Sequence, residues 1–91
     1  MHCRIRVFGK VQGVAFRYYT KLKADELGLV GTTENLGDGS VVIMVQGSKE
    51  EMDLFMTWCH EGSPASEVKK VNMEDLSGSE SQEYKEFSIL R

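Results

Sequence analysis

The sequence predicts an α+β fold in which two helices pack on one face of an antiparallel sheet. Two observations lead to this fold class. Runs of alternating apolar residues, typical of strands, and runs of helical period follow one another in the order β-α-β-β-α-β. Each helical run carries a single apolar stripe, so both helices must bury it against the same sheet face. The 91 residues suffice for one domain, residues 1–91, and no repeat or linker divides them.

The first strand is expected at residues 2–8, where Cys3, Ile5 and Val7 alternate with polar residues. Residues 29–36 and 40–46 are expected to pair across the Gly-Asp-Gly turn at 37–39, and the apolar run at 41–45 is typical of an interior strand. Charges within residues 67–76 favour an edge strand. A polar loop, expected to be mobile, follows at residues 77–83, and Phe87 and Ile89 mark a short last strand.

Two helices are expected between these strands. The first spans residues 16–27 and ends at Gly28, a residue type common at helix C-termini. The second begins at Ser48, which forms a capping box with Glu51, and ends before Gly62. The predicted buried stripes are Phe16, Thr20, Ala24 and Leu27 on the first helix and Met52, Phe55, Met56 and Cys59 on the second.

Composition excludes several classes of protein. The formal charge is −3 and no basic stripe is present, which argues against a general nucleic-acid binder. No apolar run reaches the roughly 18 residues of a membrane span, and the N-terminus lacks signal-peptide order, so a cytoplasmic location is expected. Cys3 and Cys59 are far apart and outside any metal-binding spacing, which favours two free, buried thiols over a disulfide or a zinc site.

The stretch from Gly9 to Arg17 carries the strongest functional signal. A loop bounded by Gly9 and Gly13 leads into a helix, and such loops can present successive backbone N–H groups to an anion. Arg17 adds a guanidinium that suits a phosphoryl group. By glycine spacing alone, a tight turn with a surface arginine is the favoured explanation, because such spacing is common. Asn35, before the 37–39 turn, is either a turn former or an amide able to orient water.

The residue identities add a resemblance to a known family. Residues 7–17, VFGKVQGVAFR, resemble the first signature of acylphosphatases, and residues 31–41, GTTENLGDGSV, continuing to Gly47, resemble the second. The resemblance implies a ferredoxin-like βαββαβ sandwich that hydrolyses small-molecule acyl phosphates as a monomer without a metal or organic cofactor. It also implies that Arg17 binds the phosphoryl group and Asn35 positions the attacking water. The implied phosphate-binding residues are Gln12, Gly13, Val14, Ala15, Phe16 and Arg17.

Three positions depart from the family pattern. Thr32 stands where an aromatic residue is usual, Thr33 where a small aliphatic residue is common, and Glu34 where a basic residue is frequent. Neighbours on a regular strand point to opposite faces, so Glu34 is expected to face away from Asn35. The departures are therefore expected to affect packing more than chemistry, unless a bulge interrupts the strand.

Two other functions remain open at this level. The same fold could keep the anion-binding loop as a binding module, either a sensor or the accessory domain of a larger protein. A split βαβ RNA-binding domain would need exposed aromatic rings on its sheet, whereas the first strand offers only Phe8 beside its basic residues. Under the enzyme hypothesis the acyl group stays open, since acetyl, carbamoyl and glyceroyl phosphates share the phosphoryl end that the signatures contact.

Overall fold

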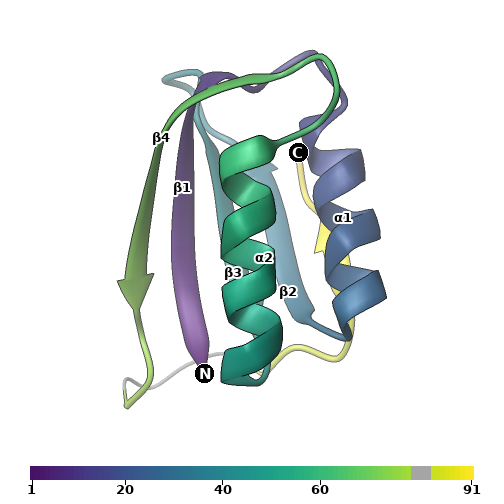
Figure 1. The fold of residues 1–91 in the computed structure, drawn as a ribbon, viewed down its shortest axis with the longest axis vertical. Helices are drawn as coiled ribbons and strands as arrows, with labels where there is room; N and C mark the ends of the chain where they lie inside the picture. The colour runs from purple at the N-terminus through teal and green to yellow at the C-terminus, as the bar shows by residue number, and fades with distance from the viewer. Residues whose placement is uncertain (79–82) are drawn as a thin grey trace.

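The computed structural model describes residues 1–78 and 83–91. Its strands are β1 (His2–Lys10), β2 (Val30–Asn35), β3 (Val41–Gln46), β4 (Glu67–Asp75) and β5 (Phe87–Ile89), and its helices are α1 (Phe16–Leu27) and α2 (Lys49–Glu61). The strands form one sheet in the order β4-β1-β3-β2-β5. Both helices lie side by side on one face of this sheet, as Figure 1 shows. The expected α+β sandwich is therefore confirmed.

The sheet is mixed, whereas the sequence predicts an antiparallel one. The pairs β1–β3, β1–β4 and β2–β3 are antiparallel, as expected. The short β5 instead runs parallel to β2, on the sheet edge opposite β4. From β4 the chain returns to that far edge, where Phe87 becomes fully buried in the core. Burial of an aromatic ring there stabilises a strand of only three residues.

The core lies between the sheet and the helices. Cys3, Ile5 and Val7 point into it from β1 and are fully buried, whereas Arg4 lies on the other sheet face. The helices contribute the buried side chains Phe16, Thr20 and Ala24 from α1 and Met52, Phe55 and Cys59 from α2. Leu27 and Met56 pack against this core while partly exposed. The predicted helix stripes are thus confirmed, and both cysteines are free and buried, as expected.

The expected helix ends and turn are also present. Gly28 ends α1 in the left-handed conformation, and the Ser48 side chain accepts a hydrogen bond from the backbone N–H of Glu51 at the start of α2. Strand β4 lies at the sheet edge and β3 in its interior. Of the polar loop expected at 77–83, residues 79–82 lie outside the described part of the chain.

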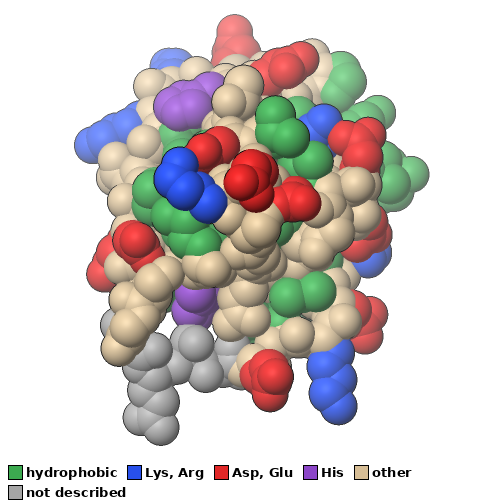
Figure 2. Space-filling view, turned by 60° about the horizontal axis from the view of Figure 1, so that its bottom comes forward, with side chains coloured by type: hydrophobic (Ala, Val, Ile, Leu, Met, Phe, Trp, Pro, Cys, Tyr) green, Lys and Arg blue, Asp and Glu red, His purple; other side chains and the backbone are tan. Residues whose placement is uncertain are grey.

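Charged side chains are mixed on the surface. On the face shown in Figure 2, the basic side chains are scattered among acidic ones and do not gather into a patch. Several of the described basic side chains also pair with a carboxylate, as Lys21 does with Asp25 and Lys49 with Asp53. Exposed pairs of this kind add little to stability, about 0–1 kcal/mol each.

Candidate active site

The loop between β1 and α1 and the end of β2 meet at one end of the sheet. There they enclose a cavity of about 190 Å³. Figure 1 shows this end at the top, where the chain's last residue also lies beside the start of α1. The residues that line the cavity are Val11, Gly13, Ala15, Phe16, Arg17, Tyr18, Asn35 and Ile89.

The loop backbone has the geometry of an anion-binding nest. Gly13 has a φ of 74° and Ala15 a φ of 59°, so two left-handed residues flank Val14. Left-handed residues placed in this way turn successive backbone N–H groups toward one concave side. Ala15 is also the N-cap of α1, and none of the described side chains caps the helix there. The first N–H groups of α1 are therefore left for a ligand at the positive end of the helix dipole.

Side chains hold the loop in place from two directions. The Gln12 side-chain amide donates hydrogen bonds to the carbonyl oxygens of Leu36, at 2.8 Å, and Ser40, at 2.9 Å. The Ser63 hydroxyl, which follows α2, donates to the carbonyl oxygen of Val14 at 2.9 Å. The loop is thus tied both to the β2–β3 turn and to the end of α2. Such preorganisation keeps backbone dipoles fixed when charge develops on a substrate.

The β2–β3 turn is itself stabilised by a polar network. The Ser40 hydroxyl donates to Asp38, and Arg6 donates both to that hydroxyl, from Nε at 3.1 Å, and to the Asp38 carboxylate. Hydrogen bonds from the Ser40 side chain and backbone, with a smaller contribution from the Arg6 charge, hold the pKa of Asp38 below its ordinary value. Through Arg6, this network therefore also anchors the turn that follows Asn35 to strand β1.

Arg17 and Asn35 face the cavity with unused polar groups. Arg4 and Arg6 each pair with a carboxylate, whereas Arg17 has no hydrogen-bond or ion-pair partner within the described residues. The side-chain oxygen of Asn35 is buried and has no partner there either. Buried polar atoms are nearly always paired, so an unpaired one beside a half-buried arginine indicates a binding site for polar ligands.

Strand β2 places Asn35 without distortion. Its pairing with β3 runs without a register shift from Val30 to Asn35. Asn35 therefore shares the core side of the sheet with the buried Thr33, and Glu34 points to the other face, as expected from the strand period. The Asn35 N–H also donates to the carbonyl oxygen of Arg91 at 2.7 Å. The acidic departure at Glu34 thus leaves the cavity unaffected.

The structure brings together most of the residues named from the sequence. Gly13, Ala15, Phe16, Arg17 and Asn35 line one cavity. Gln12 and Val14 are not among the lining residues. Instead, the Gln12 side chain donates two hydrogen bonds and the Val14 carbonyl oxygen accepts one, and these three bonds hold the loop in place.

Sequence reasoning did not assign three further residues to this end of the sheet. They are Ser63, Tyr18 and Ile89. Ser63 lies 49 residues from its partner Val14, and no local pattern reports a contact over that distance.

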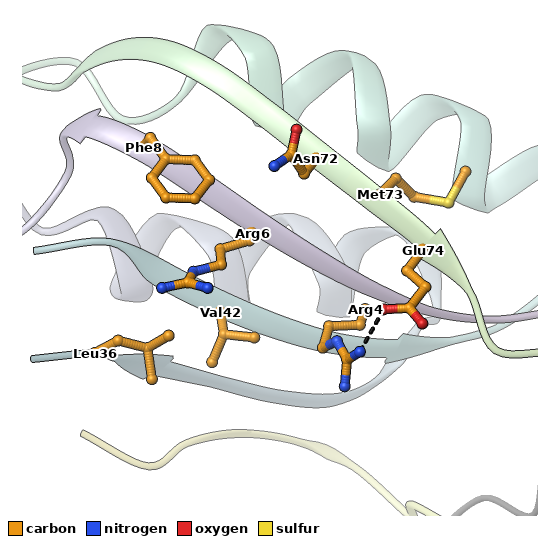
Figure 3. Close-up of a pocket in the computed structure, with 8 residues that line it drawn as sticks. All are labelled: Arg4, Arg6, Phe8, Leu36, Val42, Asn72, Met73 and Glu74. Atoms are coloured by element: carbon orange, nitrogen blue, oxygen red, sulfur yellow. Dashed lines mark hydrogen bonds and ion pairs between the residues drawn. The ribbon is translucent and has the colours of Figure 1, made fainter. Parts of the chain in front are cut away.

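A second, larger hollow lies on the open face of the sheet. Its volume is about 450 Å³, and it is lined by Arg4, Arg6, Phe8, Leu36, Val42, Asn72, Met73 and Glu74. Figure 3 shows these side chains on the face away from the helices, with Arg4 paired to Glu74. Both of its arginines already engage carboxylates, and Phe8 lies beneath Arg6 and Lys70. This hollow therefore offers no uncompensated charge comparable to Arg17.

Two negative findings concern the described part of the chain. It contains no group of three or more His, Cys, Asp or Glu side chains that could hold a metal ion. It also contains no helix long and apolar enough to cross a membrane.

A two-layer α+β sandwich with a nest-shaped loop, an arginine unpaired among the described residues and a buried amide describes a small domain with a polar candidate site. Comparisons with known proteins give the family. A family model described as acylphosphatase matches residues 3–89. An acylphosphatase of Acaryochloris marina is 45% identical over 85 residues, which cover 93% of this chain and 88% of the relative. The chain therefore belongs to the acylphosphatase family, and it is an enzyme of that family.

Solved structures agree with this assignment. The crystal structure of acylphosphatase from Bacillus subtilis superposes with a TM-score of 0.91 at 33% identity, covering 99% of this chain and 98% of that one. Full-length HypF, solved in a phosphate- and nucleotide-bound form, matches with a TM-score of 0.87 at 30% identity. This chain covers only 12% of HypF, so the same fold also occurs within a much longer protein.

Proposed function

We propose that this chain hydrolyses the carboxyl–phosphate bond of acyl phosphates, giving a carboxylate and inorganic phosphate by in-line attack of water at phosphorus. Family membership supports the reaction class. The observation that carries the mechanism is that Arg17 and the buried side-chain oxygen of Asn35 belong to the lining of one cavity, and neither has a partner among the described residues. One group suits the phosphoryl charge and the other suits a water molecule.

The loop and Arg17 bind the phosphoryl group. Backbone N–H groups from Gln12 to Phe16 and the first turn of α1 donate to the phosphoryl oxygens, and the Arg17 guanidinium donates in a bidentate manner. The positive φ angles at Gly13 and Ala15 and the free helix N-terminus support this role. Because these donors are fixed before the substrate arrives, they stabilise the charge of the transition state without reorganisation.

Asn35 positions the attacking water. Its buried side-chain oxygen accepts a hydrogen bond from that water and holds it in line with the bond that breaks. The backbone bond from Asn35 to Arg91 and the regular β2–β3 pairing fix the amide relative to the loop. A displacement of about 1 Å in such an arrangement can cost roughly a hundredfold in rate, so rigidity at this position matters.

Hydrolysis of an acyl phosphate needs no general acid. The leaving group is a carboxylate, a weak base with a pKa near 4 that departs without protonation. The new P–O bond forms from water as the P–O bond to the carboxylate breaks, and water's protons pass to phosphate and solvent. The chain is proposed to do this as a cytoplasmic monomer, without metal or organic cofactor.

Variants of the two site residues test the proposal. Arg17→Ala and Asn35→Ala are each expected to lower acyl-phosphate turnover by about 10²–10³, the usual effect of losing one transition-state donor. Leu54→Ala, a change at an exposed position on α2, is the control and should retain wild-type turnover. Circular dichroism and urea denaturation report whether each variant is folded.

Two results would contradict the proposal. Near-normal turnover in a folded Arg17→Ala or Asn35→Ala variant would contradict the role that the mechanism assigns to that residue. Saturable binding of inorganic phosphate by a wild-type protein that turns over no acyl phosphate would favour a binding module instead. HypF, in which this fold is one part of a larger protein, is an example of such an accessory position.

A further inference from the structure

The cavity extends beyond the groups needed to hold phosphate. Val11 and Phe16, each 1% exposed, form its floor. Tyr18 and Ile89 are 56% and 40% exposed and form its rim, one from α1 and the other from β5. An acyl phosphate bound by its phosphoryl group at the loop has to direct its acyl group past this rim toward solvent.

The two sides of the rim are fixed relative to one another. The Lys21 side chain on α1 donates a hydrogen bond to the carbonyl oxygen of Phe87 on β5 at 2.8 Å. The backbone N–H of Leu90 donates to the carbonyl oxygen of Thr33 at 2.8 Å, which holds the residues after β5 against β2. Tyr18 and Ile89 therefore face the same opening from rigid elements, and an acyl group between them would lose little further conformational entropy from the protein.

The chemistry of the lining favours an apolar acyl group. Among the residues that line the cavity, Arg17 is the one charged side chain, and the phosphoryl group engages it. A charged acyl group would find no further counter-ion in this lining. The tyrosine ring and the isoleucine side chain of this lining instead offer apolar area to an aromatic ring or an aliphatic chain.

We infer that Tyr18 and Ile89 form a two-sided acyl subsite, which makes acyl phosphates with aromatic or aliphatic acyl groups the preferred substrates. This inference rests on the proposed function and deepens it. The loop, Arg17 and Asn35 act on the phosphoryl end, which all acyl phosphates share. The rim acts on the acyl end and sets the order of preference among them.

The test compares benzoyl phosphate with acetyl phosphate in the wild type, Tyr18→Ala and Ile89→Ala. For each substrate, kcat/KM is divided by its wild-type value, so the different intrinsic reactivities of the two substrates cancel. Each variant is expected to lose about three- to tenfold with benzoyl phosphate, the effect of removing one aromatic or apolar contact, and less than twofold with acetyl phosphate. Inhibition by inorganic phosphate, which has no acyl group, is expected to stay unchanged.

Matched controls separate this effect from a general loss of structure. Leu22→Ala removes an exposed aliphatic side chain from α1 that does not line the cavity, and Leu54→Ala removes another from α2. Both should leave the benzoyl-to-acetyl ratio at its wild-type value. Tyr18→Phe keeps the ring and is expected to keep the ratio.

The outcomes distinguish the two proposals. A benzoyl-to-acetyl ratio that is unchanged in Tyr18→Ala or in Ile89→Ala overturns the two-sided subsite while leaving acyl-phosphate hydrolysis intact. Equal losses with both substrates also overturn it, because they report on the phosphoryl end or on folding. A folded wild-type protein that hydrolyses neither substrate overturns the proposed function and the subsite together.

Discussion

Two side-chain oxygen atoms on β2 are both buried but have different surroundings. The side-chain oxygens of Asn35 and Thr33 both lack a hydrogen-bond partner within the described residues. Asn35 lines the cavity, whereas Thr33 is fully buried and does not line it. An unsatisfied hydroxyl in an apolar environment costs about 1–3 kcal/mol. Thr33 thus destabilises the fold without contributing to the site.

Replacing this hydroxyl by a methyl group should stabilise the protein. Thr33→Val keeps the shape of the side chain and removes the unpaired oxygen, so the free energy of unfolding is expected to rise by about 1 kcal/mol. Turnover should stay within twofold of wild type. Urea denaturation followed by circular dichroism measures the change.

Thr20→Val is the matched control for this prediction. Thr20 is equally buried, but its hydroxyl donates to the carbonyl oxygen of Phe16 at 2.7 Å. Its replacement removes a made hydrogen bond and should lower stability by about 0.5–1.5 kcal/mol. A loss of stability in Thr33→Val would mean that its hydroxyl is hydrogen-bonded in solution.

At the scale of elements, β2 is the strand that places Asn35 at the candidate site. It pairs with β3 on one side and β5 on the other, and it ends at Asn35. Close approach of β2 to β3 depends on Gly31, whose φ is 149° and where a methyl group would overlap the carbonyl oxygen of Met44. A side chain at this position has to displace the backbone of the interior strand.

A single methyl group at this position is therefore expected to weaken both stability and activity. Gly31→Ala should lower the free energy of unfolding by about 2 kcal/mol or more, through backbone strain and steric overlap. Turnover should fall as well, because the shift propagates along β2 to Asn35. Thermal denaturation and an acyl-phosphate assay measure the two effects.

Gly37 provides the control for this substitution. It lies in the β2–β3 turn, no atom lies near the position of an added methyl group, and its φ is not positive. Gly37→Ala should change stability by less than about 0.5 kcal/mol. Similar losses in the two variants would show that the effect belongs to glycine replacement in general rather than to the β2–β3 contact.

The elements also show what the sequence could and could not predict. Periodicity located the helices and the four main strands, because the buried stripe of each is a local property of the chain. The signatures gave Arg17 and Asn35 through residue identity. The direction of β5 was not predictable, since nothing within three residues reports which edge they join. The rim residue Ile89 and the brace from Ser63 to Val14 depend on such long-range contacts and were missed for the same reason.

At the scale of the whole molecule, the two buried thiols make the stability of the fold depend on pH. Burial raises the pKa of Cys59 far above its ordinary value. Burial, together with the negative charge of Asp75, also raises the pKa of Cys3. In the unfolded chain both thiols ionise near their ordinary pKa of about 8.5. The unfolded state therefore releases these protons first as the pH rises.

The sign of this coupling predicts a loss of stability at alkaline pH. The stabilisation that comes from keeping Cys59 protonated is complete below the unfolded pKa and declines as the pH rises toward the higher folded pKa. Above pH ~8.5 the free energy of unfolding should fall with a slope approaching about 1.4 kcal/mol per pH unit for this thiol. Urea denaturation at pH 7, 8.5 and 10 measures the slope.

Cys59→Ala should be less stable at pH 7, because a buried side chain is truncated, yet it should show a shallower alkaline decline. Equal slopes in the wild type and Cys59→Ala would assign the decline to other groups.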